Sequence, residues 1–350
     1  MLPDIILVTN GTNIRYFSGF DGSSGQLILF RKNNFGSGFL FTDGRYHLVA
    51  NVSLKPGFKI IDVTASFEDA WKDFIKKYKV KNLGIEGNYM SVRRFKSFKK
   101  ISRNIKIDDI GDELDKKRIS KKSVEIDIIK RAQNIIDKVF AAIKKWLKPG
   151  QTENDIAWKI ETLAHDFGAD CLSFPSIVGI NENSAAPHHH NTNKKLKRGD
   201  MILIDMGATH KGYCSDMTRV LFTKSPTGKQ EKIYELVKKA HETAIAKLKS
   251  GVTGKNIDAV ARDVIAKTGF GAYFSHSLGH GVGMDIHELP NLSQKYSGKI
   301  PAKSVVTIEP GIYLPGEFGV RLEDMVIVEN NGVTNLTKTP KELKSAIIKI

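Results

Sequence analysis

The sequence predicts an α+β fold in two domains, a smaller α/β domain over residues 1–115 and a larger domain over residues 116–350. In the first part of the chain, short apolar runs of strand length alternate with a helical pattern, which is typical of a small sheet covered by helices. In the rest, two helical segments followed by a β-hairpin occur twice in succession. This repetition indicates a second domain built from two pseudo-symmetric halves, with its site where the halves meet.

Strands and one helix define the predicted N-terminal domain. Strands are expected at Ile5–Val8, Gln26–Phe30 and Gly38–Phe41. The segment Phe67–Tyr78 has apolar residues at helical spacing and is expected to form an amphipathic helix. Residues 107–120 are rich in Asp, Gly and Lys, so they are expected to form the linker between the domains.

Four helices are predicted in the second domain. They span Ser123–Leu147, a segment from Thr152 to about Gly168, Gly228–Lys249, and Thr253–Gly269. Pro149 and Gly150 stop the first helix, and Thr152 with Asp155 has the spacing of a capping box at the start of the second.

The two predicted hairpins each carry two acids. In the first hairpin, 201–222, Asp205 ends an apolar run and Asp216 opens the return strand. In the second, 305–328, Glu309 ends an apolar run and Glu323 lies inside the return strand Val320–Val328. Hairpin neighbours can direct side chains to one spot, and four converging carboxylates would repel one another unless a cation lay between them.

A histidine in the Gly-rich stretch 276–283, His280, can complete such a set of ligands. Oxygen ligands with one imidazole suit Mn²⁺, Co²⁺, Fe²⁺ or Zn²⁺ better than a thiolate site would. Five ligands are enough for two divalent metal ions that share bridging carboxylates. We expect two metals bound by Asp205, Asp216, His280, Glu309 and Glu323.

The chain resembles the pita-bread metallopeptidases, and within them the Xaa-Pro branch that contains prolidase and aminopeptidase P. The segments that carry the resemblance are Ile204–Gly207, Ser215–Arg219, His276–Gly283, Ile308–Gly311 and Val320–Asp324. The segments Asn13–Phe20 and Phe41–Tyr46 resemble the N-terminal domain that these enzymes share with creatinase. The resemblance implies a pita-bread catalytic domain behind a creatinase-like N-terminal domain, a homodimer, and Mn²⁺ as the metal, with Co²⁺ or Zn²⁺ as alternatives.

The resemblance also implies roles for individual residues. Glu309 matches a glutamate that both binds metal and shuttles a proton, and His276 and His287 match histidines that contact the substrate or the intermediate. His188 matches a substrate-binding histidine, although the family usually has Gly where this chain has His189. Arg321 matches an arginine that supports the site. Because a Xaa-Pro bond needs an apolar slot for the proline ring, the residues considered as its walls are Phe174, Pro175 and Ile286.

Composition limits the other possibilities. The formal net charge is +16, but the basic clusters, among them Asp115–Lys122, are expected to be solvated surfaces, and no specific nucleic-acid partner is expected. Two cysteines, Cys171 and Cys214, are too few for a disulfide framework. No signal peptide or membrane-spanning run is evident, so a cytoplasmic location is expected.

The expected activity is a metal-dependent exopeptidase that acts on peptides with proline second, of the aminopeptidase P type. Prolidase, which cleaves only Xaa-Pro dipeptides, is the alternative. Methionine aminopeptidase is disfavoured by the N-terminal domain, and creatinase, which uses this fold without metals, by the five ligand residues. A noncatalytic protein that binds RNA or a ribosome is the most distant alternative, since it predicts eroded ligands.

Overall fold

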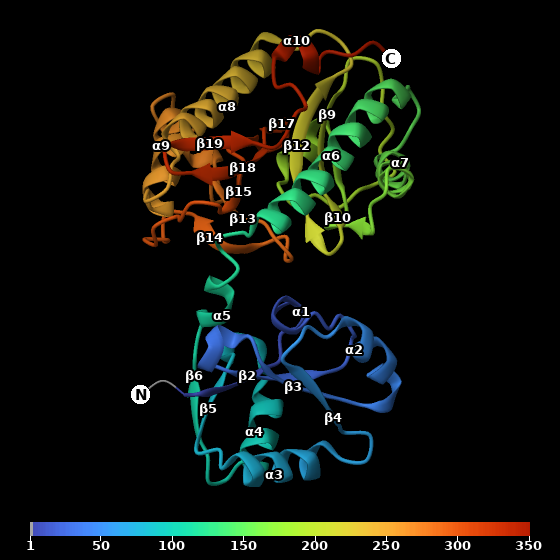
Figure 1. Cartoon of the computed structure of the whole chain (residues 1–350). Coiled ribbons are helices and arrows are strands. Elements are labelled where there is room, and N and C mark those ends of the chain that lie inside the picture. The colour runs from blue at the N-terminus through green and yellow to red at the C-terminus, as the bar shows by residue number, and fades with distance from the viewer. Residues whose placement is uncertain (1–2) are drawn as a thin grey trace. The chain divides into compact units, whose positions relative to one another are not determined.

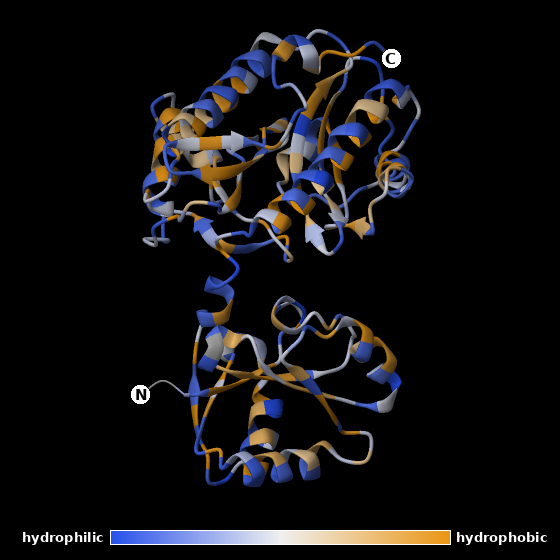
Figure 2. Ribbon diagram, viewed as in Figure 1, coloured by the Kyte–Doolittle hydropathy of each residue, from blue (hydrophilic) through white to orange (hydrophobic). Residues whose placement is uncertain are grey.

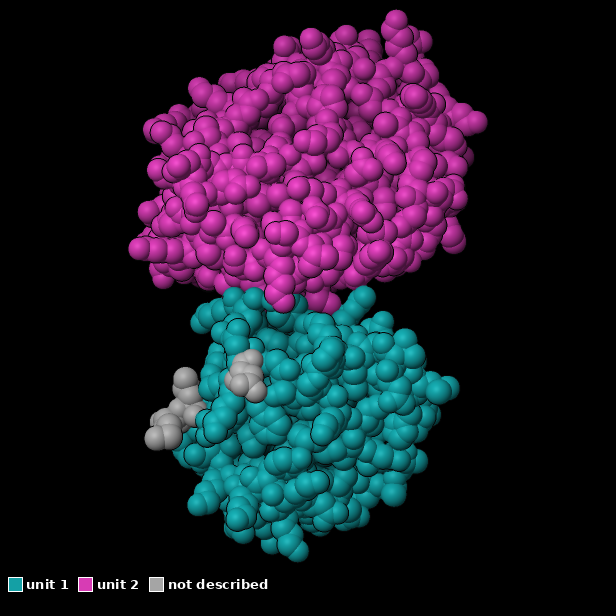
Figure 3. Space-filling view, viewed as in Figure 1, with its two compact units in different colours: residues 1–117 teal, residues 118–350 magenta. Residues whose placement is uncertain are grey.

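The computed structural model describes residues 3–350 and divides the chain into two compact units, one that ends at Lys117 and one that spans Arg118–Ile350 (Figure 3). The boundary lies close to the one expected after residue 115. Among the described residues, no helix is both long and apolar enough to cross a membrane.

The first unit is a six-stranded mixed sheet in the order β4-β3-β2-β1-β5-β6 with helices on both faces (Figure 1). Its strands are β1 (Ile5–Val8), β2 (Gln26–Phe30), β3 (Gly38–Thr42), β4 (Phe58–Asp62), β5 (Asn82–Ile85) and β6 (Lys106–Asp109). Its helices are α1 (Gly11–Ser18), α2 (His47–Ser53), α3 (Phe67–Tyr78), α4 (Val92–Ile101) and α5 (Glu113–Lys116). The predicted strands and the predicted helix Phe67–Tyr78 are confirmed, with β3 one residue longer than expected.

Strand alternation explains the two cores of this unit. Ile5 and Leu7 of β1 pack with Trp71 of α3 on one face, whereas Ile6 and Val8 pack with Ile14 of α1 on the other. A central strand with helices on both sides is apolar at every position, which is why β1 has no alternation in its sequence. Figure 2 shows the strands of this sheet largely in orange.

The expected linker 107–120 is wrong over much of its length. Residues up to Asp109 complete the sheet as β6, which pairs in parallel with β5. Glu113–Lys116 then forms α5, where the buried Asp115 accepts a hydrogen bond from Asn13 at 2.9 Å. The polar composition that suggested a linker belongs to an edge strand and a short helix.

The second unit contains five α-helices. They are α6 (Ser123–Trp146), α7 (Glu153–Asp166), α8 (Gly228–Lys247), α9 (Gly254–Ala266) and the short α10 (Leu343–Ala346). Two of them, α6 and α7, precede the strands of the first half, and another two, α8 and α9, precede those of the second half. All four predicted helices are present and end one to three residues early. Thr152 and Asp155 form the expected capping box, with Asp155 N donating to Thr152 Oγ1 at 3.0 Å and Thr152 N donating to Asp155 Oδ2 at 2.8 Å.

Four small sheets make up the rest of this unit. In the first half, β12-β9-β8 and β11-β10-β7 comprise β7 (Cys171–Leu172), β8 (Ile177–Ile180), β9 (Met201–Met206), β10 (Ala208–His210), β11 (Tyr213–Cys214) and β12 (Met217–Phe222). In the second half, β14-β13-β15-β18-β19 and β16-β17 comprise β13 (Gly279–Gly281), β14 (Glu288–Leu292), β15 (Val305–Ile308), β16 (Gly311–Leu314), β17 (Phe318–Arg321), β18 (Asp324–Glu329) and β19 (Gly332–Asn335). The predicted order of two helices and then a hairpin, twice over, is confirmed (Figure 1).

Both hairpins are interrupted at corresponding places. In the first, β9 pairs with β12 while β10 pairs with β11, and the chain changes sheets at Gly207 and again before Asp216. Gly207 is required because a Cβ there would lie 2.1 Å from the carbonyl oxygen of Ser215. In the second hairpin, the expected single strand Val320–Val328 is wrong, because β17 and β18 are separate strands with Glu323 between them.

Candidate metal centre

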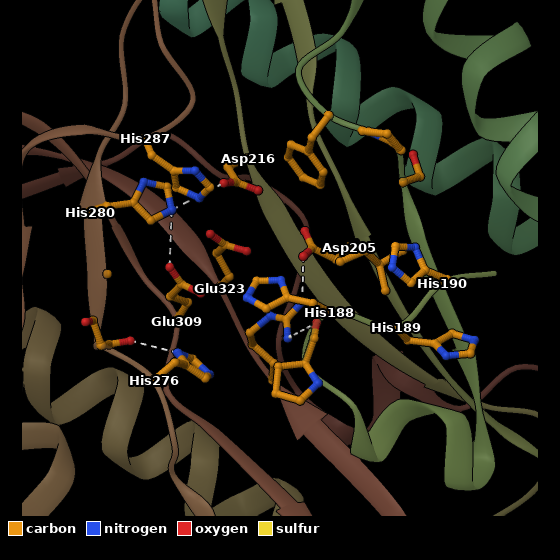
Figure 4. Close-up of a pocket in the computed structure, with 18 of the residues that line it drawn as sticks. His188, His189, His190, Asp205, Asp216, His276, His280, His287, Glu309 and Glu323 are labelled. Atoms are coloured by element: carbon orange, nitrogen blue, oxygen red, sulfur yellow. Dashed lines mark hydrogen bonds and ion pairs between the residues drawn. The ribbon is translucent and has the colours of Figure 1, made fainter. Parts of the chain in front are cut away.

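The second unit contains a cavity of about 580 Å³ lined by residues from both of its halves (Figure 4). Every site residue that the sequence predicts lines it, namely His188, Asp205, Asp216, His276, His280, His287, Glu309, Arg321 and Glu323. Phe174 and Pro175, the expected walls of a proline slot, also line it. Ile286 is not part of this lining, so that expectation is wrong; its side chain packs against the apolar cluster that includes Ile126 and Val282.

Four carboxylates enter the cavity where the hairpins are interrupted. Asp205 lies near the end of β9 and Asp216 directly before β12, while Glu309 directly follows β15 and Glu323 directly precedes β18. The backbone N–H of Glu323 donates to the carbonyl of Thr218 at 3.2 Å, which joins the two halves at this point. Each half therefore contributes one acid from each strand of its hairpin.

The acids are close together and poorly compensated. Asp216, His280 and Glu323 each offer a ligand atom, and these atoms lie within 4.8 Å of one another. Burial, reinforced by the neighbouring carboxylates, raises the pKa of Asp216 and of Glu323 well above the usual range. Oδ1 of Asp205 and Oε1 of Glu323 are buried and have no hydrogen-bond partner in the described protein. A divalent cation that prefers oxygen ligands could bind to these two unpartnered oxygen atoms.

The protonation state of His280 also supports a cation site. Its Nδ1 lies 3.1 Å from the carbonyl oxygen of Gly281, which can only accept, so Nδ1 carries the proton of the neutral ring. Burial lowers the pKa of His280 to about 3, so the ring is neutral. The bare Nε2 faces Glu309 Oε1 at 3.3 Å and Asp216 Oδ2 at 3.7 Å. When Glu309 and Asp216 are ionised, all three atoms are acceptors, and a cation is the group that would pair with them.

Arg321 brings a positive charge to the lining of the cavity. Its guanidinium is buried and donates to Asp205 Oδ2 at 2.5 Å, to Thr218 Oγ1 at 2.9 Å and to the Tyr313 hydroxyl at 2.8 Å. Thr218 Oγ1 in turn donates to Glu323 Oε2 at 2.7 Å. The arginine therefore contacts Asp205 of the first half directly and Glu323 of the second half through Thr218.

His276 is connected to this arginine through Tyr313. The Tyr313 hydroxyl lies 2.8 Å from His276 Nε2, and His276 Nδ1 lies 2.8 Å from the carbonyl of Ser277. Since that carbonyl fixes the proton on Nδ1, Tyr313 donates to Nε2 and accepts from Arg321. Burial lowers the pKa of His276 to about 4. Both ring nitrogens of His276 are thus engaged by the protein.

Tyr313 is absent from the sequence-based site, although the hairpin register could have found it. Gly311 pairs with Arg321 and Tyr313 pairs with Gly319, so Tyr313 and Arg321 are diagonal neighbours on one face of the β16–β17 ribbon. This register follows from the separate β16–β17 ribbon. The sequence predicts one continuous return strand instead, so it does not identify Tyr313.

A contact with Glu153 distinguishes His189 from its neighbour His188 in the run of three histidines. His189 Nε2 lies 2.9 Å from Glu153 Oε2, so this ring is tied to helix α7. His188 lines the cavity and is exposed, so its substrate-binding role stays a prediction that this placement allows. The ring of His287 enters the cavity beside His280, with 4.3 Å between the ring centroids (Figure 4).

The segment that carries His287 is held from outside the cavity. Arg118 Nη2 donates to Asp285 Oδ2 at 2.8 Å, and Lys121 Nζ donates to Glu288 Oε1 at 2.5 Å. Arg118, Lys121 and Glu288 are buried. The expectation that the basic cluster 115–122 is a solvated surface is therefore wrong for Arg118 and Lys121, which pair with acids on both sides of His287.

Comparison with known proteins agrees with this geometry. The sequence matches the creatinase/prolidase N-terminal domain over residues 3–120 and metallopeptidase family M24 over residues 127–330. It is 36% identical over 356 residues to the Xaa-Pro dipeptidase of Pyrococcus furiosus, covering 97% of this chain and 95% of that protein.

Two solved structures extend the comparison to the whole fold. The Xaa-Pro dipeptidase from Bacillus anthracis has a TM-score of 0.93 at 34% identity, over 99% of this chain and 95% of that one. The X-Pro aminopeptidase from Thermotoga maritima has a TM-score of 0.90 at 34% identity, over 99% of this chain and 98% of that one. The expected pita-bread fold is confirmed, and the chain belongs to metallopeptidase family M24, with a creatinase/prolidase N-terminal domain ahead of its peptidase domain.

Proposed function

We propose that this protein is a dinuclear metallo-exopeptidase that hydrolyses the Xaa-Pro bond at the N-terminus of peptides. The observation that carries the proposal is the arrangement around His280, whose unprotonated Nε2 faces Glu309 and Asp216 in a cavity that also holds buried, unpartnered carboxylate oxygens. The names of the relatives, Xaa-Pro dipeptidase and X-Pro aminopeptidase, support the choice of substrate class.

Five side chains would hold the metals: Asp205, Asp216, His280, Glu309 and Glu323. When bound, two divalent ions polarise the scissile carbonyl and lower the pKa of an attacking water. Hard oxygen ligands with one imidazole favour Mn²⁺, with Co²⁺ or Zn²⁺ as alternatives.

Proton transfer is assigned to Glu309. Its carboxylate lines the cavity and receives a hydrogen bond from Thr307 Oγ1 at 3.1 Å. A carboxylate in this position can take a proton from the attacking water and return it to the leaving proline nitrogen. Thr307 also accepts from the backbone N–H of His280 at 3.1 Å, so it keeps Glu309 and His280 in fixed positions.

Two of the remaining polar side chains would orient the substrate, and a third would support Arg321. His188 and His287 enter the cavity from opposite halves and are placed to contact the peptide. His276, whose ring nitrogens are engaged by Tyr313 and Ser277, acts with Tyr313 to fix the guanidinium of Arg321. Phe174 and Pro175 offer the apolar wall that a proline ring requires.

Aminopeptidase P activity on longer peptides is our first choice, and prolidase activity on dipeptides is the alternative, since relatives with both kinds of name cover nearly the whole chain. A homodimer and a cytoplasmic location remain predictions. A noncatalytic role in binding RNA or a ribosome is disfavoured, because all five ligand residues are present in one cavity.

The proposal is tested by comparing three substrates with the Mn²⁺-loaded protein. An Ala-Pro dipeptide, an Ala-Pro-Ala-Ala tetrapeptide and an Ala-Ala-Ala-Ala control separate the outcomes. Release of Ala from the tetrapeptide with proline second supports aminopeptidase P, and cleavage of the dipeptide alone supports prolidase. Equal cleavage of the control without proline would contradict the Xaa-Pro assignment.

A further inference from the structure

One acid outside the cavity organises the loop that brings His188 into it. Glu153 lies in the first turn of α7, is fully buried, and is not among the residues that line the cavity. The loop from Ile180 to Thr192 runs from the end of β8 past His188. Apart from the short 3₁₀ helix Asn181–Ala185, the loop has no regular structure, so its shape depends on side-chain contacts.

The two oxygens of Glu153 accept hydrogen bonds from both ends of this loop. Oε1 accepts from Ile180 N at 2.9 Å and Asn183 Nδ2 at 2.8 Å. Oε2 accepts from His189 Nε2 at 2.9 Å, Thr192 N at 2.9 Å and Thr192 Oγ1 at 2.7 Å. The carboxylate of Glu153 therefore satisfies the backbone N–H groups of Ile180 and Thr192, which in a strand or helix would donate to backbone carbonyls.

The donors keep Glu153 ionised despite its burial. Burial by itself raises the pKa of a carboxyl group, but the hydrogen bonds from His189, Thr192, Ile180 and Asn183 lower the pKa of Glu153 below its usual value. An ionised acceptor makes stronger hydrogen bonds than a neutral one, so the loop is anchored firmly at this point.

A second anchor acts on the other side of the same loop. Asn191 Oδ1 accepts from Val178 N at 2.8 Å, and Asn191 Nδ2 donates to the carbonyl of Ser176 at 2.8 Å. With His189 turned to Glu153 and Asn191 pinned to the start of β8, the backbone on both sides of His188 is constrained. His188 itself stays exposed to the cavity.

We propose that Glu153 is a positioning residue for substrate binding, which acts through His189 and Thr192 to hold His188 against the bound peptide. This inference rests on the proposed peptidase function for its kinetic consequences, whereas the anchoring of the loop can be measured without turnover.

The decisive substitution is Glu153→Gln. The amide nitrogen of glutamine only donates, so in either orientation it faces a backbone N–H, that of Ile180 or that of Thr192. We expect KM for an Xaa-Pro peptide to rise about tenfold while kcat stays nearly unchanged, since an anchored substrate contact is lost and the metal ligands are untouched. The matched control is Glu161→Gln, which removes an exposed acid from the same helix and should leave both constants unchanged.

His189→Ala is the second variant, because it removes one contact and leaves the other donors of Glu153 in place. The double variant combines Glu153→Gln with His189→Ala. If Glu153 acts through His189, this double variant should raise KM by less than the product of the two single effects. Full multiplication of the effects, or an unchanged KM in both folded single variants, would overturn the inference.

Hydrogen exchange of the loop amides separates this inference from the proposed function. At least one of the Ile180 and Thr192 amides should exchange faster in Glu153→Gln than in the wild type and Glu161→Gln, whether or not the protein hydrolyses any peptide. If the wild-type protein fails to cleave Xaa-Pro substrates, the proposed function falls while exchange still reports on the loop. Unchanged protection of these amides would overturn the positioning role.

Discussion

Arg321 Nη2 donates to Asp205 Oδ2 at 2.5 Å inside a cavity that three further acids enter. The arginine side chain is only 4% exposed, so water screens its charge little. Its charge opposes the effect of burial on Asp216, Glu309 and Glu323, whose pKa values are nevertheless raised. Arg321 therefore compensates part of the acid cluster, and the metals would compensate the rest.

Replacement of Arg321 by Met should destabilise the metal-free protein by about 3 kcal/mol, because removing one partner of a buried ion pair leaves an uncompensated charge. Saturating Mn²⁺ should make the difference from the wild type smaller, since the acids then have another counter-charge. Urea unfolding with and without Mn²⁺ measures both values, with the exposed Arg198→Met as control. An equal loss of stability in the two conditions would show that Arg321 does not act by balancing the acids.

The pairs on both sides of His287 lead to a second prediction. Lys121→Met should cost about 3 kcal/mol of stability, because Glu288 loses a donor at 2.5 Å in a buried position. KM for an Xaa-Pro peptide should also rise, since Glu288 directly follows His287 in the chain. The exposed Lys130→Met on α6 serves as control.

The double substitution Lys121→Met with Glu288→Leu checks the physical reason. Removing both partners leaves no buried unpaired acid, and Arg118, which lies 3.6 Å from Glu288, keeps its ion pair with Asp285, so much of the lost stability should return. If the double variant is less stable than Lys121→Met by the full cost of a further core substitution, the ion pair is not the source of the effect.

A third prediction concerns pH. His241 is fully buried, lies 3.6 Å from Asp324 Oδ2, and has a pKa that burial lowers to about 3. The unfolded chain binds a proton at this histidine below its ordinary pKa of 6.5, whereas the folded chain does not. Stability must therefore fall as the pH drops from 6.5 towards 3, by about 1.4 kcal/mol per pH unit from this group.

His241→Leu should remove that contribution. Urea unfolding between pH 4.5 and 7.5, at about half-unit steps, gives the slope of stability against pH for both proteins. The variant should show a shallower slope below pH 6.5, whatever its absolute stability. Identical slopes in the two proteins would mean that His241 takes up its proton in the folded state.

Much of the fold and of the candidate site follows from local sequence. The acids Asp205 and Glu309 end apolar strand runs, and the helix Phe67–Tyr78 has both its spacing and its Ser66 cap within a short window. Such features depend on neighbours a few residues away, so period and turn chemistry reveal them. The sequence predicts the position of Glu323 less accurately and places it inside one strand. The chain is interrupted there because β17 pairs with β16 whereas β18 pairs with β15.

The features that sequence reasoning missed depend on contacts between distant segments. Lys121 is expected in solvent because lysines usually lie there, yet it is buried and donates to Glu288, far along the chain. Glu153 occupies the first turn of a helix, where an acid is ordinary, and its contacts with His189 and Thr192 arise only when the loop folds back. Tyr313 likewise acquires its role from the register of a hairpin.

The central claim is that two metals bound by the five ligand residues are required for Xaa-Pro hydrolysis. The direct measurement titrates the metal-stripped protein with Mn²⁺ and follows both bound metal and cleavage of an Xaa-Pro peptide, with Asp216→Asn, Glu309→Gln and the exposed Asp263→Asn in parallel. The account predicts full activity at two equivalents in the wild type and in Asp263→Asn, and activity near background in the other two variants, which remain folded. Turnover retained by either ligand variant, or the absence of metal-dependent cleavage in the wild type, would contradict it.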